Sequence, residues 1–249
     1  MGKKRKKIRG KSRFYLYWIL ILAVVFLTGY KATNLFRNMV FFTIREVNIK
    51  GNKHVNNQYL QSISAHLIGS NIFKTNTDDI ELSYQAVSRV KSIKCKKVFP
   101  HKLVITVKER QGMFLIKDAS GDFHPIDNEK YVLDKADWYL NEDLPLISIN
   151  VPKDKIVIGQ KIEDPRIDRI FDVYDVLIKT NAKIIADISE FYFRNDDLYF
   201  IDQNSGCRVI FSTENLAQQI SRFIFLRDNQ GFERNSTIDL RFDSQIIVT

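Results

Sequence analysis

The chain contains two cysteines, four histidines and several neighbouring acids, which are the residue types that bind metals or act in acid–base and nucleophilic catalysis. The histidines show no metal-ligand spacing: His54, His66, His101 and His124. Phosphate-binding loops, a GxSxG elbow and HExxH are all absent. The acidic pairs Asp78-Asp79 and Asp196-Asp197 fall where a helix start and a turn are expected, and acids are common there. We therefore predict no catalytic, cofactor or metal site, and a protein that is not an enzyme.

The two cysteines, Cys95 and Cys207, lie far apart in the sequence. In an oxidising compartment they could pair, but one possible pair does not make a disulfide framework. We favour two separate, buried thiols.

The N-terminus predicts a chemistry of a different kind, contact with lipid. Residues 14–30 contain no charge, and the thirteen residues before them hold eight Lys or Arg and no acid. Seventeen helical residues cover about 25 Å, which is near the lower limit for crossing a bilayer core. The positive-inside rule then places the basic tail, residues 1–13, in the cytoplasm. The residues that set this topology are Lys3, Lys4, Arg5, Lys6, Lys7, Arg9, Lys11 and Arg13.

Three other interpretations of this segment are weaker. A cleaved signal peptide would have a shorter apolar stretch and small residues at the cut site, whereas Thr28-Gly29-Tyr30-Lys31 is a poor site. A buried core helix fits less well beside a dense basic tail. The tail could bind nucleic acid, but topology and anionic lipid explain it sufficiently. We expect a type II single-pass protein of the cytoplasmic membrane, with all later residues outside the cytoplasm.

The part of the chain after the basic tail is nearly neutral. The whole chain has a net charge of +9, and removing the eight tail positives leaves about +1. The high net charge therefore does not indicate a basic partner-binding surface beyond the membrane. We divide the chain into a tail (1–13), a transmembrane helix (14–30), a linker (31–42) and two domains (43–110 and 111–249).

The first domain is expected to contain five elements in the order β-α-α-β-β. Their expected bounds are residues 43–50, 57–67, a helix from Thr77 on, and a hairpin of 93–98 and 103–109. We expect Gly69 to end the first helix and the Thr77 hydroxyl to cap the second. The two helices would cover one face of a small sheet.

The second domain is expected to be a mostly antiparallel β domain with two helices, which makes the fold class α+β. In the first helix Asp164 caps, Pro165 takes the first position, and six residues form the apolar stripe: Ile167, Ile170, Phe171, Tyr174, Leu177 and Ile178. The second helix spans roughly 214–227. Strands are expected at 113–117, 123–126, 146–151, 191–193, 198–202, 207–211, 237–242 and 245–249.

Four phrases of the sequence carry a resemblance: IREVNIKGNKHV, KVFPHKLVITVKER, SRFIFLRDN and STIDLRFDSQIIVT. The first two, after a membrane anchor, look like a POTRA domain, and the last two are similar to the closing helix and terminal strands of the bacterial cell-division family FtsQ, also called DivIB. Together with the anchor and the POTRA segment, the resemblance covers almost the whole chain. The resemblance implies a divisome scaffold at the division septum that binds FtsB-like and FtsL-like proteins outside the membrane and links them to septal peptidoglycan synthesis. The short tail leans toward the Gram-negative form of the family.

The resemblance also implies where partners bind, because the family's partner contacts gather at the last two strands. Transferred to this sequence, the partner-binding residues are Arg241, Phe242, Ser244, Gln245 and Ile247. If the last strand is a sheet edge, it can accept a partner strand. Ile238, Leu240 and Phe242 alternate as one strand face, so Phe242 is equally compatible with a core position.

Two other functions remain open from the sequence. A POTRA domain also occurs in secretion or outer-membrane assembly factors, although usually in tandem and before a series of barrel strands that this chain lacks. A membrane-anchored wall hydrolase would need a nucleophile, a metal or paired carboxylates, for which no signature is visible. No nucleic acid or small-molecule substrate is expected.

Overall fold

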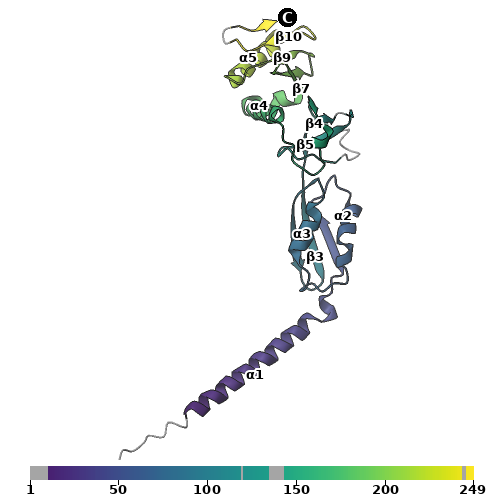
Figure 1. Ribbon diagram of the computed structural model, residues 1–249, viewed down its shortest axis with the longest axis vertical. Coiled ribbons are helices and arrows are strands. Elements are labelled where there is room, and N and C mark those ends of the chain that lie inside the picture. The colour runs from purple at the N-terminus through teal and green to yellow at the C-terminus, as the bar shows by residue number, and fades with distance from the viewer. Residues whose placement is uncertain (1–10, 119, 135–142, 243–244) are drawn as a thin grey trace, which may run out of the picture. The chain divides into compact units, whose positions relative to one another are not determined.

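The computed structural model describes residues 11–118, 120–134, 143–242 and 245–249 (Figure 1). These residues form two compact units. The first unit comprises the chain up to Lys50 together with 57–83 and 94–106, and the second comprises 51–56, 84–93 and 107–249. The second unit therefore includes the ends of two strands from the first sheet as well as the whole of the second sheet.

Helix α1 spans Lys11–Arg37 and is the one described helix that is long and apolar enough to cross a membrane. Its candidate span, Phe14–Arg37, has 24 residues, and an 18-residue window within it has a mean hydropathy of 1.7 and is not buried at all. The candidate span contains the predicted segment 14–30 and continues for seven residues beyond it. Residues 3–9, on which much of the topology prediction rests, lie outside the described part of the chain.

The first sheet has three strands in the order β1-β3-β2, namely Glu46–Lys50 (β1), Lys102–Glu109 (β3) and Val90–Val98 (β2). Strands β1 and β3 run parallel. The helices α2 (Asn57–Ser64) and α3 (Thr77–Gln85) lie between β1 and β2 in the chain, so the predicted order β-α-α-β-β is confirmed. Leu60, Ile80 and Leu103 are buried and hold these layers together.

The ends of α2 and α3 confirm one predicted signal and correct another. Gly69 has φ of +89°, the left-handed conformation that ends helices and that other residues adopt reluctantly. At the start of α3, however, the cap is Asn76, whose Oδ1 accepts a hydrogen bond from Asp78 N at 3.1 Å. The prediction of a Thr77 hydroxyl cap is wrong because the amide side chain one residue earlier is better placed for this bond.

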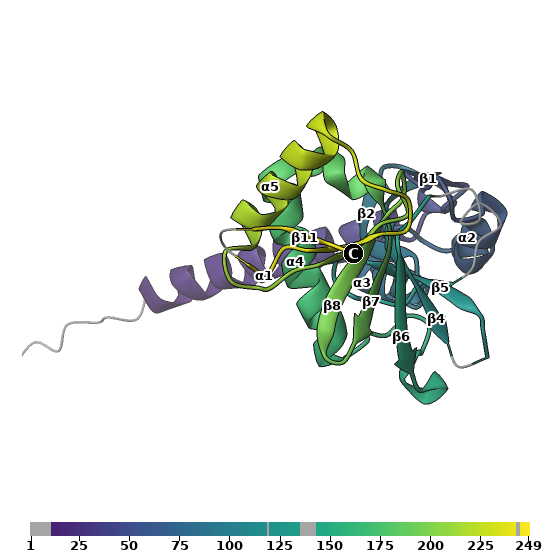
Figure 2. The ribbon, with the colours of Figure 1, turned by 90° about the horizontal axis from the view of Figure 1, so that it is seen from above.

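The second sheet has eight strands in the order β11-β10-β9-β8-β7-β6-β4-β5 (Figure 2). They are β4 (Gly112–Asp118), β5 (Phe123–Asp127), β6 (Leu146–Val151), β7 (Ile188–Arg194), β8 (Asp197–Asp202), β9 (Arg208–Ile210), β10 (Thr237–Asp239) and β11 (Ile247–Val248). Four of the seven neighbouring pairs are antiparallel and three are parallel. The fold is therefore α+β as predicted, with a mixed sheet in which antiparallel pairs form a narrow majority.

Two helices, α4 (Pro165–Asn181) and α5 (Leu216–Asn229), lie on one side of this sheet (Figure 2). Asp164 accepts a hydrogen bond from Arg166 N and Pro165 occupies the first turn, which confirms the predicted start of α4. Of the predicted stripe, Ile178 is exposed, and Val173 takes a place in the core instead. The apolar face of α4 therefore includes position 173 and does not extend to position 178.

The edge formed by β5 is covered by the turn that follows it. Asp127 is buried, and its Oδ1 accepts hydrogen bonds from the backbone N–H of Glu129 (2.9 Å) and Tyr131 (2.8 Å). The turn folds back so that Leu133 N donates to Pro125 O at 2.8 Å. The backbone along the second half of β5 is therefore already engaged by the chain's own residues.

Both cysteines are free thiols. Cys207 is buried, as predicted, and its Sγ lies 3.2 Å from Glu233 O. Cys95 is only partly buried, which corrects the prediction of two buried thiols. It lies on β2, an edge strand with one open side, and partial burial raises the pKa of its thiol.

Candidate partner-binding surface

The last strand, β11, forms the second edge of the eight-stranded sheet. Thr237 and Thr249 exchange two backbone hydrogen bonds, of 2.6 and 2.9 Å. Bonded and non-bonded pairs alternate in an antiparallel ladder, and Ile238 lies opposite Val248. The N–H and C=O groups of Val248 therefore point away from β10, toward the side where a further strand would add.

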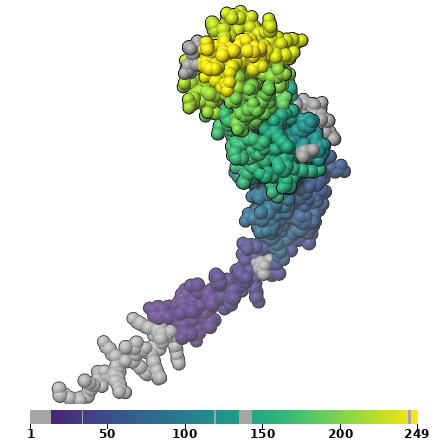
Figure 3. All heavy atoms as spheres, turned by 45° about the horizontal axis from the view of Figure 1, so that its top comes forward, coloured from purple at the N-terminus to yellow at the C-terminus, as the bar shows by residue number. Residues whose placement is uncertain are grey.

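The side chains of this edge divide into buried and exposed sets. Ile238 and Leu240 are buried in the core, whereas Phe242 is 42% exposed. The core interpretation of Phe242 is therefore wrong, because the strand ends at Asp239 and the alternation does not continue to position 242. Ile247 and Val248 are exposed as well. Figure 3 shows the terminal residues, in yellow, on the outer surface of the second unit.

Arg241 is exposed and already has acidic partners within its own chain. Its Nη2 lies 2.7 Å from Asp239 Oδ2, and its Nη1 lies 3.1 Å from Asp197 Oδ2. Burial raises the pKa of Asp239, but its hydrogen bonds with Arg241 outweigh this and lower the pKa overall. A partner carboxylate would therefore share the guanidinium with two residues of this chain.

A groove of about 540 Å³ lies beside the β11 edge, between α5 and the residues that precede β11. It is lined by Gln218, Ser221, Arg222, Phe225, Leu226, Gln245 and Ile246. Arg222 joins its two sides, because its Nη1 donates to Phe242 O at 3.0 Å. Phe225 is 65% exposed in this groove, so the groove presents an apolar ring to solvent.

Four of the five predicted partner-binding residues belong to this one edge: Arg241, Phe242, Gln245 and Ile247. The fifth, Ser244, lies outside the described residues. That any of them binds a partner stays a prediction. Phe225 and Val248 also lie at this surface and are not among the predicted residues. Phe225 could have been found, because it lies off the apolar stripe of its helix, and a large ring on the polar face of an amphipathic helix is a recognisable signal.

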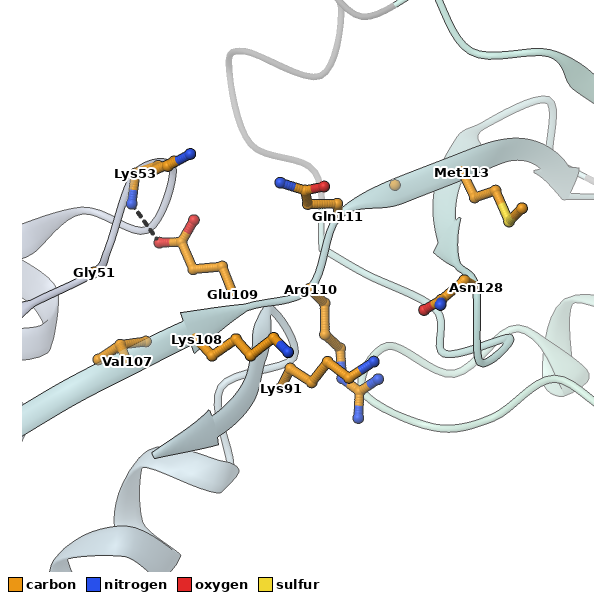
Figure 4. A pocket seen from close by; sticks show the side chains of 11 residues that line it. Gly51, Lys53, Lys91, Val107, Lys108, Glu109, Arg110, Gln111, Met113 and Asn128 are labelled. Atoms are coloured by element: carbon orange, nitrogen blue, oxygen red, sulfur yellow. Dashed lines mark hydrogen bonds between the residues drawn. The ribbon is translucent and has the colours of Figure 1, made fainter. Parts of the chain in front are cut away.

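A second hollow, of about 590 Å³, lies in the second unit where β3 leads into β4 (Figure 4). Several of its lining side chains are cationic: Lys53, Lys91, Lys108 and Arg110. Glu109 is almost fully buried there and accepts hydrogen bonds from the backbone N–H of Lys53 (2.9 Å) and Val55 (2.9 Å). Figure 4 shows the bond from Lys53 N. Glu109 thus fixes the loop that forms one wall.

Two of the cations of this hollow, Lys91 and Arg110, pair with carboxylates. Arg110 Nη1 pairs with both Asp127 and Glu129, and its guanidinium carbon lies 3.8 Å from the centre of the Tyr131 ring. Lys91 pairs with Glu129 at 2.9 Å. The hydrogen bond from Lys91, followed by that from Arg110, lowers the pKa of Glu129 to about 2. The arrangement stabilises the structure, and the described residues contain no group of His, Cys, Asp and Glu that could hold a metal ion.

The comparisons with known proteins agree with this architecture. Residues 42–110 match the family model described as "POTRA domain, FtsQ-type". The chain is 26% identical over 244 residues to the cell division protein DivIB of Clostridium botulinum strain Hall, a match that covers 97% of this chain and 91% of the relative. The cell division protein FtsQ of Syntrophotalea carbinolica is 22% identical over 60% of this chain and 52% of its own length.

The chain is thus similar over nearly its whole length to proteins of the FtsQ/DivIB family, and residues 42–110 form a POTRA domain of the FtsQ type. The names of these relatives support a role in cell division. FtsQ/DivIB proteins are scaffolds of the division machinery and are not a known enzyme family. This similarity suggests divisome proteins as partners, with α1 as the candidate membrane anchor.

Proposed function

We propose that this protein binds FtsB-like and FtsL-like partners outside the cytoplasmic membrane, by strand addition at β11, and so links them to septal peptidoglycan synthesis. The observation that supports it most is the open edge at β11, where Val248 turns its backbone groups away from the sheet. Main-chain hydrogen bonds would supply affinity, and the exposed side chains of Phe242 and Ile247 would add specificity.

The proposal includes a topology. The basic tail stays in the cytoplasm, α1 crosses the bilayer once, and both sheets lie outside, at the division septum. It also keeps the domain boundaries at residues 43–110 and 111–249. The support is the concentration of eight Lys or Arg before the apolar helix and the absence of acid among them.

The test uses the full chain in lipid nanodiscs and the extracytoplasmic segments of the cognate FtsB and FtsL homologues. We expect binding by the native chain and loss of binding when the chain is truncated after Asp243, which removes β11. Phe242→Ala is expected to weaken binding without abolishing it. Binding that survives the truncation would place the interface elsewhere. No binding by the native chain would remove the scaffold proposal's main support and return the secretion-factor alternative.

Two substitutions at one position separate main-chain from side-chain recognition. Val248→Pro removes the N–H that points outward, whereas Val248→Ala keeps it and shortens the side chain. Since one hydrogen bond contributes about 0.5–1.5 kcal/mol net, we expect Val248→Pro to weaken binding by up to about tenfold. Val248→Ala is expected to have a smaller effect. Equal effects of the two variants would mean that the side chain, and not an added strand, provides the contact.

A further inference from the structure

Five phenylalanine rings form a continuous series in the first unit, starting at the end of α1. Phe36 contacts Phe42 with ring centres 5.0 Å apart, and Phe41 contacts Phe42 at 5.3 Å. Phe42 in turn contacts Phe73 at 4.9 Å, and Phe73 contacts Phe99 at 5.0 Å. The rings come from α1, the short helix Val40–Phe42, the loop before α3 and the turn between β2 and β3. The series joins segments that are far apart in the sequence.

Most of this cluster is exposed although it is apolar. Phe41 is 59% exposed and Phe99 is 53% exposed, while only Phe42 is buried. Phe36, Met39 and Val40 are also exposed. An apolar surface of this kind, next to a membrane helix, is typical of residues that contact another apolar phase.

The charge of the segments that carry these rings indicates what kind of surface the rings contact. Residues 31–45 and 94–102, which hold four of the five rings, contain seven Lys or Arg and no Asp or Glu. One of the seven, Lys102, pairs with Glu46 just beyond the first range. Basic residues that flank apolar rings favour the interface of a bilayer with anionic lipids, because the headgroup phosphates attract them. A partner protein with an apolar surface would have no comparable electrostatic attraction to these cations.

The length of α1 places the ring cluster at the depth of the lipid headgroups. The candidate span Phe14–Arg37, which includes Lys31 and Arg37 at its end, has 24 residues and covers about 36 Å, more than a hydrocarbon core of about 30 Å. Arg37 therefore falls at the headgroup layer. Its carbonyl accepts a hydrogen bond from Asn71 Nδ2 at 2.7 Å, and its guanidinium lies 5.7 Å from the Phe73 ring centre. The helix end is thus attached to the ring cluster without an intervening linker.

We propose that Phe36, Met39, Val40, Phe41 and Phe99 embed in the interfacial layer of the leaflet at which α1 ends, so that the first unit rests on the bilayer. The ligand is the lipid surface, with headgroup phosphates against the surrounding cations. This inference relies on the proposed anchoring by α1, and it adds a second, in-plane contact to the single span.

The test uses tryptophan fluorescence of the full chain in nanodiscs of phosphatidylcholine and phosphatidylglycerol, with and without brominated acyl chains. The native Trp18 and Trp138 are replaced by Phe, and one Trp is introduced as Phe41→Trp or Phe99→Trp. Tyr59→Trp is the matched control, because Tyr59 is 54% exposed in the same unit. It lies at the start of α2, outside the ring series.

We expect the emission of Trp at positions 41 and 99 to fall in brominated discs, and to fall more when the bromines lie near the carbonyl end of the chains than near the methyl end. The control at position 59 is expected to keep its emission. Quenching at 41 and 99 no greater than at 59 would overturn the proposal. So would quenching that is stronger with bromines at the methyl end, since that would place the rings in the core.

A separate measurement tests the insertion of α1 independently of the interfacial contact of the rings. The Trp138→Phe chain retains Trp18 inside α1, and its emission reports directly on insertion of the helix. Quenching of Trp18 without quenching at 41 and 99 would leave the anchor standing and reject the interfacial contact. Unquenched Trp18 would reject the anchor itself. Unchanged circular dichroism of each variant shows that a Trp at these positions has not unfolded the unit.

Discussion

The two edges of the eight-stranded sheet differ in how their backbone groups are used. At β5 the chain folds back over its own edge, with Leu133 bonded to Pro125 and the buried Asp127 holding the turn. At β11 only two residues pair with β10, and the outward backbone groups of Val248 face the surroundings. The second half of the first edge is engaged by the chain itself, whereas no described residue pairs with the outer side of β11.

This difference shows how one sheet can restrict strand addition to one side. An unprotected edge is a general hazard, and proteins cover edges with loops, charges or proline. Here the cover at β5 includes a proline, a turn and an ion pair, while β11 is short and flanked by exposed apolar side chains. The asymmetry supports a binding role for β11, and the following experiments test it.

The largest effect is expected from opening the closed edge. Asp127→Ala removes the carboxylate that accepts two backbone N–H groups and pairs with Arg110, so buried donors lose their partner. We expect the free energy of unfolding to fall by about 3–5 kcal/mol. Chemical denaturation of the full chain in detergent, followed by circular dichroism, measures this loss.

Glu129→Gln is the matched control for Asp127→Ala, since both acids pair with the same Arg110. The side chain of Glu129 is 44% exposed, against 1% for Asp127. A much smaller loss is therefore expected, because water replaces the exposed partner. Similar losses in the two variants would show that the buried turn is not what closes this edge.

Truncation after Asp243 is expected to have a smaller effect on stability than Asp127→Ala, although it removes a whole strand. Ile247 and Val248 are exposed, and only Ile246 packs partly against the core. We expect a loss of about 1–2 kcal/mol, measured in the same denaturation experiment. A loss as large as that of Asp127→Ala would mean that β11 is a structural strand and not a site held ready for a partner.

Arg241→Ala is expected to change partner binding by less than about 1 kcal/mol, because the guanidinium is exposed and shared between Asp239 and Asp197. The same variant should raise the pKa of Asp239 toward its ordinary value, since Arg241 is what lowers it. Carboxyl titration by nuclear magnetic resonance checks the second effect. An unchanged pKa together with a large loss of binding would make Arg241 a direct anchor for the partner.

The smallest effect concerns pH and the ion pairs near the closed edge. The pKa of Glu129 is about 2 in the folded chain, against an ordinary 4.5. Its pairing with Lys91 and Arg110 therefore stabilises the fold fully above about pH 4.5, less as the pH falls, and not at all below about pH 2. Denaturation curves of the native chain and Glu129→Gln should converge over this window. Curves that stay parallel would contradict it.

The sequence was sufficient where one local signal dominates. Asp164 followed by Pro165 predicted the start of α4, and alternation placed β6 at Leu146–Val151, the bounds that it has. It was insufficient where the outcome depends on neighbours in space. Ile178 follows the helical period but is 40% exposed, and Asn76 rather than Thr77 accepts a hydrogen bond from an N–H in the first turn of α3, that of Asp78.

The sequence predicted where the candidate site lies, but it did not predict the orientation of Phe242 or the groove beside β11. Resemblance to the FtsQ/DivIB family pointed to the last two strands, and the structure places them at a sheet edge. Whether Phe242 faced inward could not be read from alternation, because the strand ends before it. The groove beside β11 depends on Arg222 reaching Phe242 O from another element, and sequence spacing does not encode such a contact.

A sheet with one open edge has a consequence for assembly. Growth of a filament by head-to-tail stacking needs two complementary free edges on every copy, and a molecule with one such edge can form at most a closed, two-fold pair. Because the turn after Asp127 engages the second half of β5, stacking of copies through this sheet would find no free partner edge along that half. A strand added at β11, as proposed, would then end in a discrete complex and would not start a fibre.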